Sequence, residues 1–430
     1  MRSMLLGALL ALSVGSAHAA VDKTAVVKTY ADVALAEYQD ALATAKRLQQ
    51  AVDALAAKPS ADTLRAARQA WLDARVPYQQ TEAFRFGNPI VDAWEGRVNA
   101  WPLDEGMIDY VDASYGIESD VNAYYVVNVI ANDSISVGGK AVDTSVIDAQ
   151  LLGEVLHEAD GNEANVATGY HAIEFLLWGQ DLNGTGPAPA DRQGTPQERH
   201  AGNRPYTDFD LANCTGGNCD RRVTYLTVVT QMLVDDLQEM VENWEADGGA
   251  RADVQADPQQ GLIAMLTGLG SLSYGELAGE RMKLGLMLHD PEEEHDCFSD
   301  NTHNSHYYNQ IGMMNVYYGR YKRIDGTVVE GTSLSQLVAE KDVELDKEVQ
   351  ARMNEAHEAM LAMKQRAETT ETYDQMIAQG NAEGNQTVQA AIDALIAQTR
   401  SFERVITALD LGGVELEGSD SLDSPDAVFQ

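Results

Sequence analysis

The chain has 430 residues, of which 67 are acidic and 30 are Lys or Arg, so its formal net charge is −37. Negative charge of this size repels polyanions, which argues against nucleic acid and anionic membrane surfaces as partners. The length is enough for two domains, each with its own apolar core.

The first 20 residues have the pattern of a secretory signal peptide. Arg2 precedes an apolar run from Leu5 to Val14, and an A-x-A cleavage site ends at Ala19. The run is too short for a membrane anchor, and no later stretch is long and apolar enough to span a bilayer. We therefore expect residues 1–20 to be removed and the protein to be exported into a bacterial periplasm.

Helical periodicity dominates the part of the chain that follows. Residues 22–57 are rich in Ala, lack Gly and Pro, and repeat apolar side chains at helical spacing. A second helix is predicted from a cap at Ser60 to about Phe86, where Gly87 and Pro89 end the pattern.

The next segment is less regular. AWEGRVNAWPLDEG, residues 93–106, is predicted as an aromatic-rich loop. Residues 135–143 are predicted as a small hairpin that turns on Gly138-Gly139. Helical patterns return at residues 148–158 and 164–178.

Residues 179–221 are rich in Gly, Pro, Asn and Asp and are the best candidate for a domain boundary. Beyond them, helical patterns cover residues 221–246, 258–288, 333–366 and 384–410. Between the second and third of these ranges, another helix is predicted to end at NVYYG, residues 315–319. The segment 258–288 contains many Gly residues, which suggests close helix packing. A long helix, a second helix, a polar loop and a helix with an aromatic-Gly end thus occur twice in the same order.

This order predicts an all-α fold of two duplicated helical bundles with little or no β-structure. The bundles are expected at residues 21–215 and 216–415, before a polar tail at residues 416–430. Cys214 and Cys219 flank TGGN, and a local disulfide is favoured in an exported protein. A zinc site is less favoured, because no second Cys pair exists.

The segment GYHAIEFLLW, residues 169–178, places two ionisable side chains in an apolar helix. His171 and Glu174 are three residues apart and share one helical face. A buried ionisable pair is costly without partners, so it is either a hydrogen-bonded core pair or a site. An imidazole and a carboxylate at this spacing can bind one metal ion together with acids from facing helices. The zinc-peptidase pattern H-E-x-x-H is absent.

Other residues are candidates to complete such a site. Glu82 shares a helical face with Arg85, although a solvated face is the alternative. The segment 295–303 offers many nitrogen and oxygen donors, with helix capping as the alternative. The candidate metal ligands are His171, Glu174, Glu82, Asp296, Glu95 and His303. The candidate supporting residues are Gly169, Arg85, Arg97, Trp178, Arg281 and Asp300. Five other histidines are expected on polar faces or in loops: His157, His200, His289, His306 and His357.

The longer stretch GYHAIEFLLWGQDLNGTG resembles the G-x-H-x-x-E motif region of the imelysin-like family, of its iron-regulated protein A type. The similarity extends to AWEGRVNAWPLDEG, GNRPYTDF, CTGGNCDRRVTYL and EHDCFSDNTHNS. The resemblance implies an all-helical, duplicated fold with a functional site at the domain interface, around Gly169, His171 and Glu174. The family is filed with the metallopeptidases, whereas many relatives are tied to iron uptake.

Three functions are compatible with these patterns. The first is an exported iron-binding protein in iron acquisition, with a metal ion or an iron chelate as ligand and a membrane iron-uptake component as partner. The second is a metallopeptidase in which Glu174 is the general base. The third is a helical binding module that holds no metal. We favour the first, because carboxylate oxygens with an imidazole suit iron better than copper(I), although another divalent metal stays open.

Overall fold

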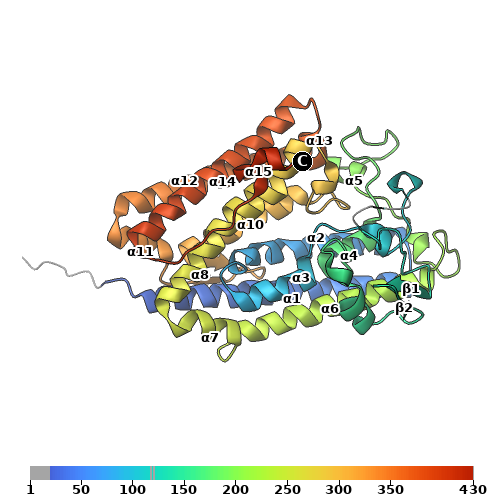
Figure 1. The fold of residues 1–430 in the computed structure, drawn as a ribbon, viewed down its shortest axis with the longest axis horizontal. Helices are drawn as coiled ribbons and strands as arrows, with labels where there is room; N and C mark the ends of the chain where they lie inside the picture. The colour runs from blue at the N-terminus through green and yellow to red at the C-terminus, as the bar shows by residue number, and fades with distance from the viewer. Residues whose placement is uncertain (1–19, 117–118, 120–121, 430) are drawn as a thin grey trace, which may run out of the picture.

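The computed structural model describes residues 20–116, 119 and 122–429, most of which lie in helices (Figure 1). The predicted signal peptide, apart from Ala20, lies outside the described residues. The all-α prediction is confirmed, because the strands among the described residues form two short hairpins. None of the helices in this part of the chain is both long and apolar enough to cross a bilayer.

The helices of the first half, with α6, form one side of the molecule. They are α1 (Lys23–Ala57), α2 (Ala61–Thr81), α3 (Pro89–Asn99), α4 (Gly169–Trp178) and α6 (Cys219–Trp244), and α5 (Pro196–His200) lies in the loop before α6. α1 packs lengthwise against α2 and α6, while α4 lies on α2, α3 and α6. Apolar faces at helical spacing pack into one core between them, centred on the rings of Tyr38, Phe84 and Trp244.

The later helices form the other side. They are α8 (Pro258–Ser271), α9 (Gly285–Leu288), α10 (Thr302–Tyr318), α11 (Leu334–Lys341), α12 (Val343–Thr369), α13 (Tyr373–Ile377), α14 (Ala382–Ala408) and α15 (Asp420–Asp423). The short helix α7 (Gly249–Ala256) still packs against α1 and α6, below α1 in Figure 1. α12 packs against α14 and α10, and α10 also packs against α2, so α10 joins the two sides (Figure 1). The predicted boundary between two bundles stays a prediction. α6 begins just after it and yet packs on α1 and α4, which precede it.

The Gly-rich segment forms one continuous helix. α8 runs into a π-helical stretch, Leu272–Leu284, and then into α9. A Cβ atom at Gly268 would overlap the carbonyl oxygen of Ala83. Glycine there lets α8 lie directly on the turn that follows α2, as the expected close packing requires.

The structure corrects three predicted elements. Part of the predicted loop 93–106 is helical, because α3 begins at Pro89. The fixed φ and missing N–H of a proline suit the first helical position. The helix predicted over 164–178 begins only at Gly169, and that over 148–158 is a short π-helical turn, Leu151–Leu156.

Two hairpins complete the described fold. β1 (Ser134–Val137) and β2 (Lys140–Asp143) pair antiparallel with Val137 opposite Lys140, which confirms the predicted hairpin. β3 (Arg320–Lys322) and β4 (Val328–Glu330) form a second hairpin that was not predicted.

The disulfide prediction is also confirmed. Cys214 and Cys219 are bonded, with their Cα atoms 5.9 Å apart, at the start of α6. Cys297 is a half-buried free thiol.

Candidate metal centre

The helix that carries the motif begins at a close backbone contact. Gly169 has φ +81°, and a Cβ atom there would overlap the carbonyl oxygen of Val98 in α3. Only glycine takes this conformation readily. Thr168 Oγ1 donates a hydrogen bond to the Arg97 carbonyl at 2.9 Å, which ties the same two segments together. α4 then passes through the core, and all of its residues are buried.

His171 and Glu174 form a hydrogen-bonded pair inside this helix. His171 Nδ1 lies 3.1 Å from Glu174 Oε2. Ser299, in the loop before α10, donates to Glu174 Oε1 from its backbone N–H at 2.9 Å and from its hydroxyl at 2.7 Å. Both oxygens of Glu174 therefore have partners, and the pair is joined to a segment more than 120 residues away along the chain.

Asp296 reaches the same place from the loop before α10. Its Oδ1 lies 3.9 Å from His171 Nδ1 and accepts a hydrogen bond from Arg75 Nη2 at 2.7 Å. Asn301 donates to Asp296 Oδ2 at 2.8 Å, and the Ser305 hydroxyl donates to the same oxygen. Asp296 and Arg75 are both fully buried, so this is a desolvated ion pair.

His295 is a member of the cluster that the sequence analysis did not select. Its ring meets that of His171 edge to face, with centroids 4.7 Å apart, and its Nδ1 lies 3.4 Å from Asp296 Oδ1. One ring nitrogen of each histidine and one oxygen of Asp296 lie within 4.8 Å of one another. The Nε2 atoms of both histidines are buried and have no hydrogen-bond partner among the described residues.

Burial and charge decide the protonation of this cluster. Burial, with help from Arg75, lowers the pKa of His171 to about 3. Burial, with help from Arg281, holds the pKa of His295 well below its usual value. Burial alone would raise the pKa of Asp296, but the Arg75 guanidinium holds it well below the usual range. Burial and the nearby Asp296 raise the pKa of Glu174. Two neutral imidazoles thus face an ionised carboxylate at neutral pH, the protonation state that metal ligands need.

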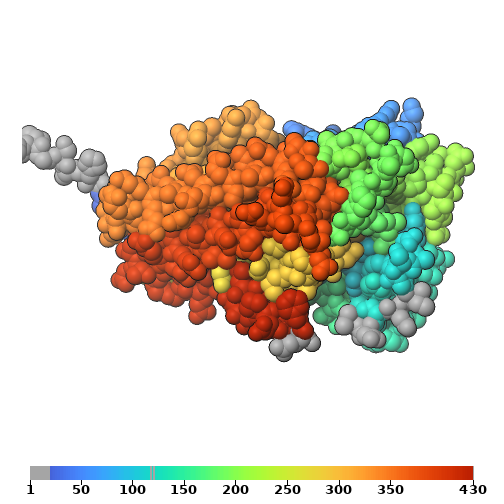
Figure 2. Space-filling view, turned by 90° about the horizontal axis from the view of Figure 1, so that it is seen from above, coloured from blue at the N-terminus to red at the C-terminus, as the bar shows by residue number. Residues whose placement is uncertain are grey.

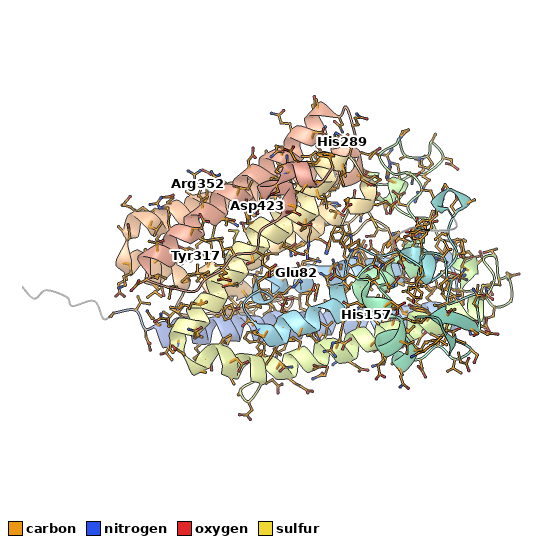
Figure 3. The ribbon with its side chains drawn as sticks, in the orientation of Figure 1. Glu82, His157, His289, Tyr317, Arg352 and Asp423 are labelled. Carbon is orange, nitrogen blue, oxygen red and sulfur yellow. A yellow bond between two sulfur atoms is a disulfide. The ribbon has the colours of Figure 1, made fainter. Side chains whose placement is uncertain are left out.

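Glu82 lies in a second polar cluster beside the first, between α2 and α10 (Figure 3). Its Oε2 accepts hydrogen bonds from Arg281 and, at 3.1 Å, from Asn309. Asn99 connects the clusters: its amide nitrogen donates to Glu82 and to Glu95, and its Oδ1 accepts from Arg75 at 2.6 Å.

The remaining predicted residues are spread around these clusters. Glu95 lies on α3, 3.5 Å from Arg85. Arg97 points away, to Asp236 and Glu239 on α6. Trp178 packs on Trp71 at the end of α4, with Arg68 over its ring. His303 is buried and bonded to Asn304. Asp300 faces a different histidine, His200.

A surface cavity reaches the back of the Arg75–Asp296 pair. It has a volume of about 230 Å³ and is lined by Arg75, Asn301 and Ser305, among others. These three side chains all bond Asp296. Asp296 itself is fully buried and does not line the cavity, so these three side chains separate it from the cavity.

The donor set fits a metal ion. Two imidazoles and one carboxylate are the ligand set that non-haem iron sites use. The Nε2 atom of each histidine has no hydrogen-bond partner among the described residues, so it is available to an acceptor or to an ion. Arg75 is the competitor, because its guanidinium already neutralises Asp296. Asn99, Ser299, Arg75 and His295 were not among the selected site residues. His295 and Ser299 lie in the donor-rich segment 295–303, whereas Arg75 and Asn99 offered no sequence signal.

The fold and this centre define an all-helical protein with a buried imidazole–carboxylate cluster. The chain belongs to the imelysin family, peptidase family M75, whose model matches residues 34–402. The resemblance inferred from the motif segments is thereby confirmed. Iron-regulated protein A from Synechococcus elongatus is 39% identical over 72 residues, which are 17% of this chain and only 20% of that relative.

Two solved structures are similar over most of their lengths. A protein described as an iron-regulated protein A precursor, from Parabacteroides distasonis, has a TM-score of 0.63 at 19% identity, covering 91% of this chain and 96% of that one. An imelysin-like protein from Psychrobacter arcticum has a TM-score of 0.54 at 14% identity, covering 92% and 99%. At these identities the similarity establishes the fold.

Two of the histidines expected on polar faces, His200 and His306, are instead fully buried. Both ring nitrogens of His306 lack a hydrogen-bond partner within the described part of the chain, and burial lowers its pKa to about 3. The sequence pattern did not reveal this, because α10 has polar residues on every face.

Acid should therefore destabilise the protein through His306. The unfolded chain takes up a proton near pH 6.5 and the folded one only near pH 3, so stability is lost as the pH falls through this range. One such group contributes at most about 1.4 kcal/mol per pH unit. In urea unfolding between pH 7 and pH 5, His306→Phe, which keeps the ring contact with Tyr373, should lose less stability than the wild type. Equal losses in the two proteins would contradict the assignment.

Proposed function

We propose that the protein is an exported iron-binding protein that takes part in iron acquisition, with iron as its cargo. The metal would be held by His171, His295 and Asp296. The observation that carries this proposal is that two buried, neutral imidazoles each place one ring nitrogen within 4.8 Å of an oxygen of one ionised carboxylate. The Nε2 atom of each ring has no hydrogen-bond partner among the described residues. Membership of the imelysin family and the similarity to iron-regulated protein A support the choice of iron.

Glu174 orients the site in this proposal. One of its oxygens is bonded twice by Ser299 and the other faces His171 Nδ1. A carboxylate that accepts the Nδ1–H of a histidine leaves the Nε2 lone pair free for a metal, as is usual for metal-bound histidines. Glu82, Glu95 and His303 then lie outside the first set of ligands. Glu82 and Glu95 are bonded to Arg281, Arg85 and Asn99 instead.

Arg75 gives the site a release mechanism. A bound cation and the guanidinium compete for Asp296, because the two positive charges repel each other in a desolvated site. Reversible binding suits a protein that passes iron on, as a free ion or a chelate, to a membrane uptake component. Export to the periplasm is proposed from the N-terminal pattern, and the Cys214–Cys219 disulfide fits an oxidising compartment.

The peptidase alternative has less support. A general base needs a free oxygen next to the water that it activates. Glu174 is fully buried and uses both oxygens within the protein. The metal-free alternative keeps the His171–Glu174 pair as a core hydrogen bond, but it gives no reason for the unpartnered nitrogens of His171 and His295.

Metal content by mass spectrometry, after equilibration with iron, zinc and copper in turn, tests the proposal. We expect stoichiometric iron in the wild type and none in His171→Gln or His295→Gln. Glu174→Gln should retain the site with iron affinity weakened roughly 10–100-fold, as for other residues that orient a ligand.

The matched control is His357→Gln, because His357 lies on α12 and bonds Tyr307 outside the cluster. It should bind iron as the wild type does. Absence of metal in the wild type, or equal iron in all four variants, would contradict the proposal.

A further inference from the structure

A second imidazole–carboxylate cluster lies away from His171, where four segments meet. Asp181 follows α4, His200 ends α5, Asp300 precedes α10, and Asp374 opens α13. α5 and α13 lie side by side in Figure 1, and Figure 2 shows the green segment around α5 against the orange C-terminal helices. Three of the four residues are fully buried, and Asp181 is half-buried.

The carboxylates converge on one nitrogen. His200 Nδ1 lies 3.0 Å from Asp374, 3.4 Å from Asp300 and 3.8 Å from Asp181, measured to Oδ2 in each case. His200 Nε2 lies 2.9 Å from the carbonyl oxygen of Gly186. A carbonyl can only accept, so Nε2 carries the ring hydrogen. Nδ1 then points either a lone pair or a second proton at the carboxylates.

The protein holds two of these carboxylates in place from behind. Asp181 Oδ1 accepts hydrogen bonds from the backbone N–H and the side-chain amide of Asn183, both at 2.9 Å. Asp374 Oδ1 accepts from the Gln375 backbone N–H at 2.7 Å and from the Thr372 hydroxyl. In each case the bonded oxygen is Oδ1, which leaves Oδ2 directed at the shared centre.

Buried carboxylate oxygens beside the cluster line a small cavity. Oδ1 of Asp300 and Oε1 of Glu294 are buried without a hydrogen-bond donor in the described parts of the chain, while Oδ2 of Asp300 faces His200 Nδ1 at 3.4 Å. Asp181, Asp300, Asp374 and Glu294 line one small cavity of about 20 Å³. That is the room that one water molecule or one ion needs. Buried carboxylate oxygens are normally satisfied, and a water molecule or an ion in this cavity would supply the missing partner.

The negative charge of the cluster also favours a bound cation. Three aspartates face one imidazole, and a fourth carboxylate, that of Glu294, lines the neighbouring cavity. Arg192 is the basic side chain that acts on Asp181 and Asp300, but it donates its hydrogen bonds to the carbonyls of residues 198, 200 and 201. Burying this many like charges is unfavourable unless a cation or protons compensate them.

We propose that Asp181, His200, Asp300 and Asp374, with Glu294, form a second cation site, built for a divalent ion that prefers oxygen ligands, such as Mn²⁺. Carboxylates select the harder ions, and one imidazole favours Mn²⁺ or Fe²⁺ over Ca²⁺ and Mg²⁺. The ion would fasten the loops at Asp181 and Asp300 to α13. The second of these loops also carries His295, Asp296 and Ser299, so the ion would hold the loop of the first centre in place.

The alternative occupant is a proton. A doubly protonated His200 would pair with the three aspartates as a structural ion-pair network. The two cases make opposite predictions for Asp300→Asn/Asp374→Asn without metal. Removing repulsion from an empty cation site should raise the unfolding temperature, whereas breaking an ion-pair network should lower it.

Thermal unfolding with and without Mn²⁺ tests the site directly. Mn²⁺ should raise the unfolding temperature of the wild type and of His171→Gln, but not that of Asp300→Asn/Asp374→Asn. The control is Asp62→Asn at an exposed carboxylate, which should respond as the wild type does. Direct Mn²⁺ titration should show one class of sites lost in the double variant alone.

Three results would overturn the inference: no Mn²⁺ effect on the wild type, the same effect in the double variant, or loss of the effect in His171→Gln. The last would place the ion at the first centre. The outcome is separable from the proposed function, because iron loss in His171→Gln is measured independently of the Mn²⁺ response of the double variant.

Discussion

Replacing Asp109 by Asn should lower the free energy of unfolding by about 3–5 kcal/mol, the usual effect of removing one partner from a buried ion pair. Asp109 accepts hydrogen bonds from Arg222 at 2.6 and 2.9 Å and from Arg204 at 2.6 Å. Arg222 is 0% exposed and Arg204 4%. The variant leaves two buried guanidinium groups with one charged neighbour, Asp208.

The size of this effect follows from where the pair lies. Arg222 is on α6, beside the disulfide, and Asp109 lies between α3 and α4. The ion pair therefore fastens the start of α6 to the segment that precedes the motif helix. Arg204 and Arg222 hold the pKa of Asp109 below its usual value despite burial. Its contribution to stability is thus present above the unfolded pKa and is lost as the pH falls through the lower folded value.

Urea unfolding at pH 7 measures the loss. The control is Asp92→Asn, because Asp92 is 51% exposed and pairs with Arg85 at 3.0 Å. An exposed pair contributes about 1 kcal/mol or less. A loss for Asp109→Asn no larger than that of the control would show that water reaches the two arginines.

The fold class could be predicted from the sequence because helical periodicity is a local signal. Residues 22–57 and 384–410 agree with α1 and α14 to within a few residues. The errors occur where local signals conflict. Pro89 ends one helical pattern and also begins α3, so residues 93–99 of α3 were predicted as part of a loop. The second hairpin, β3 and β4, is too short to show alternation.

Part of the candidate centre could be predicted and part could not. His171 and Glu174 stood out because they are charged residues in an apolar helix. Asp296 was selected because its loop is dense in donors. Arg75 lies on α2 near Arg65 and Arg68, which favours a solvated face, and its partner is 221 residues away. Only the packing of α2 against the loop before α10 reveals the pair.

The second cluster shows the same limit more clearly. His200 was expected to be an ordinary loop histidine, and Asp181 and Asp374 gave no signal at all. Each lies in a polar segment, where carboxylates are common. The four residues become a candidate site only when α13 returns to α5, a contact between segments more than 170 residues apart.

The largest backbone effect is expected at the start of the motif helix. Gly169→Ala should destabilise the protein by about 3 kcal/mol, from 1–2 kcal/mol for a left-handed residue and a similar amount for overlap with Val98. The overlap is with backbone atoms, namely the Val98 carbonyl oxygen and its carbon at 2.6 Å, so no side-chain rotation relieves it. The motif helix must shift, and His171 moves with it.

Gly139→Ala separates the two causes. Gly139 has a similar φ, +72°, but a Cβ atom there would meet no heavy atom within 4 Å, so only the conformational part should remain, about 1–2 kcal/mol. Urea unfolding gives both losses, and iron content gives the effect on the site. We expect Gly169→Ala to be the less stable variant and to lose iron, while Gly139→Ala keeps it. Equal losses of stability with iron retained in both would mean that the contact with Val98 does not position the motif helix, and the glycine of G-x-H-x-x-E would then be required by its conformation alone.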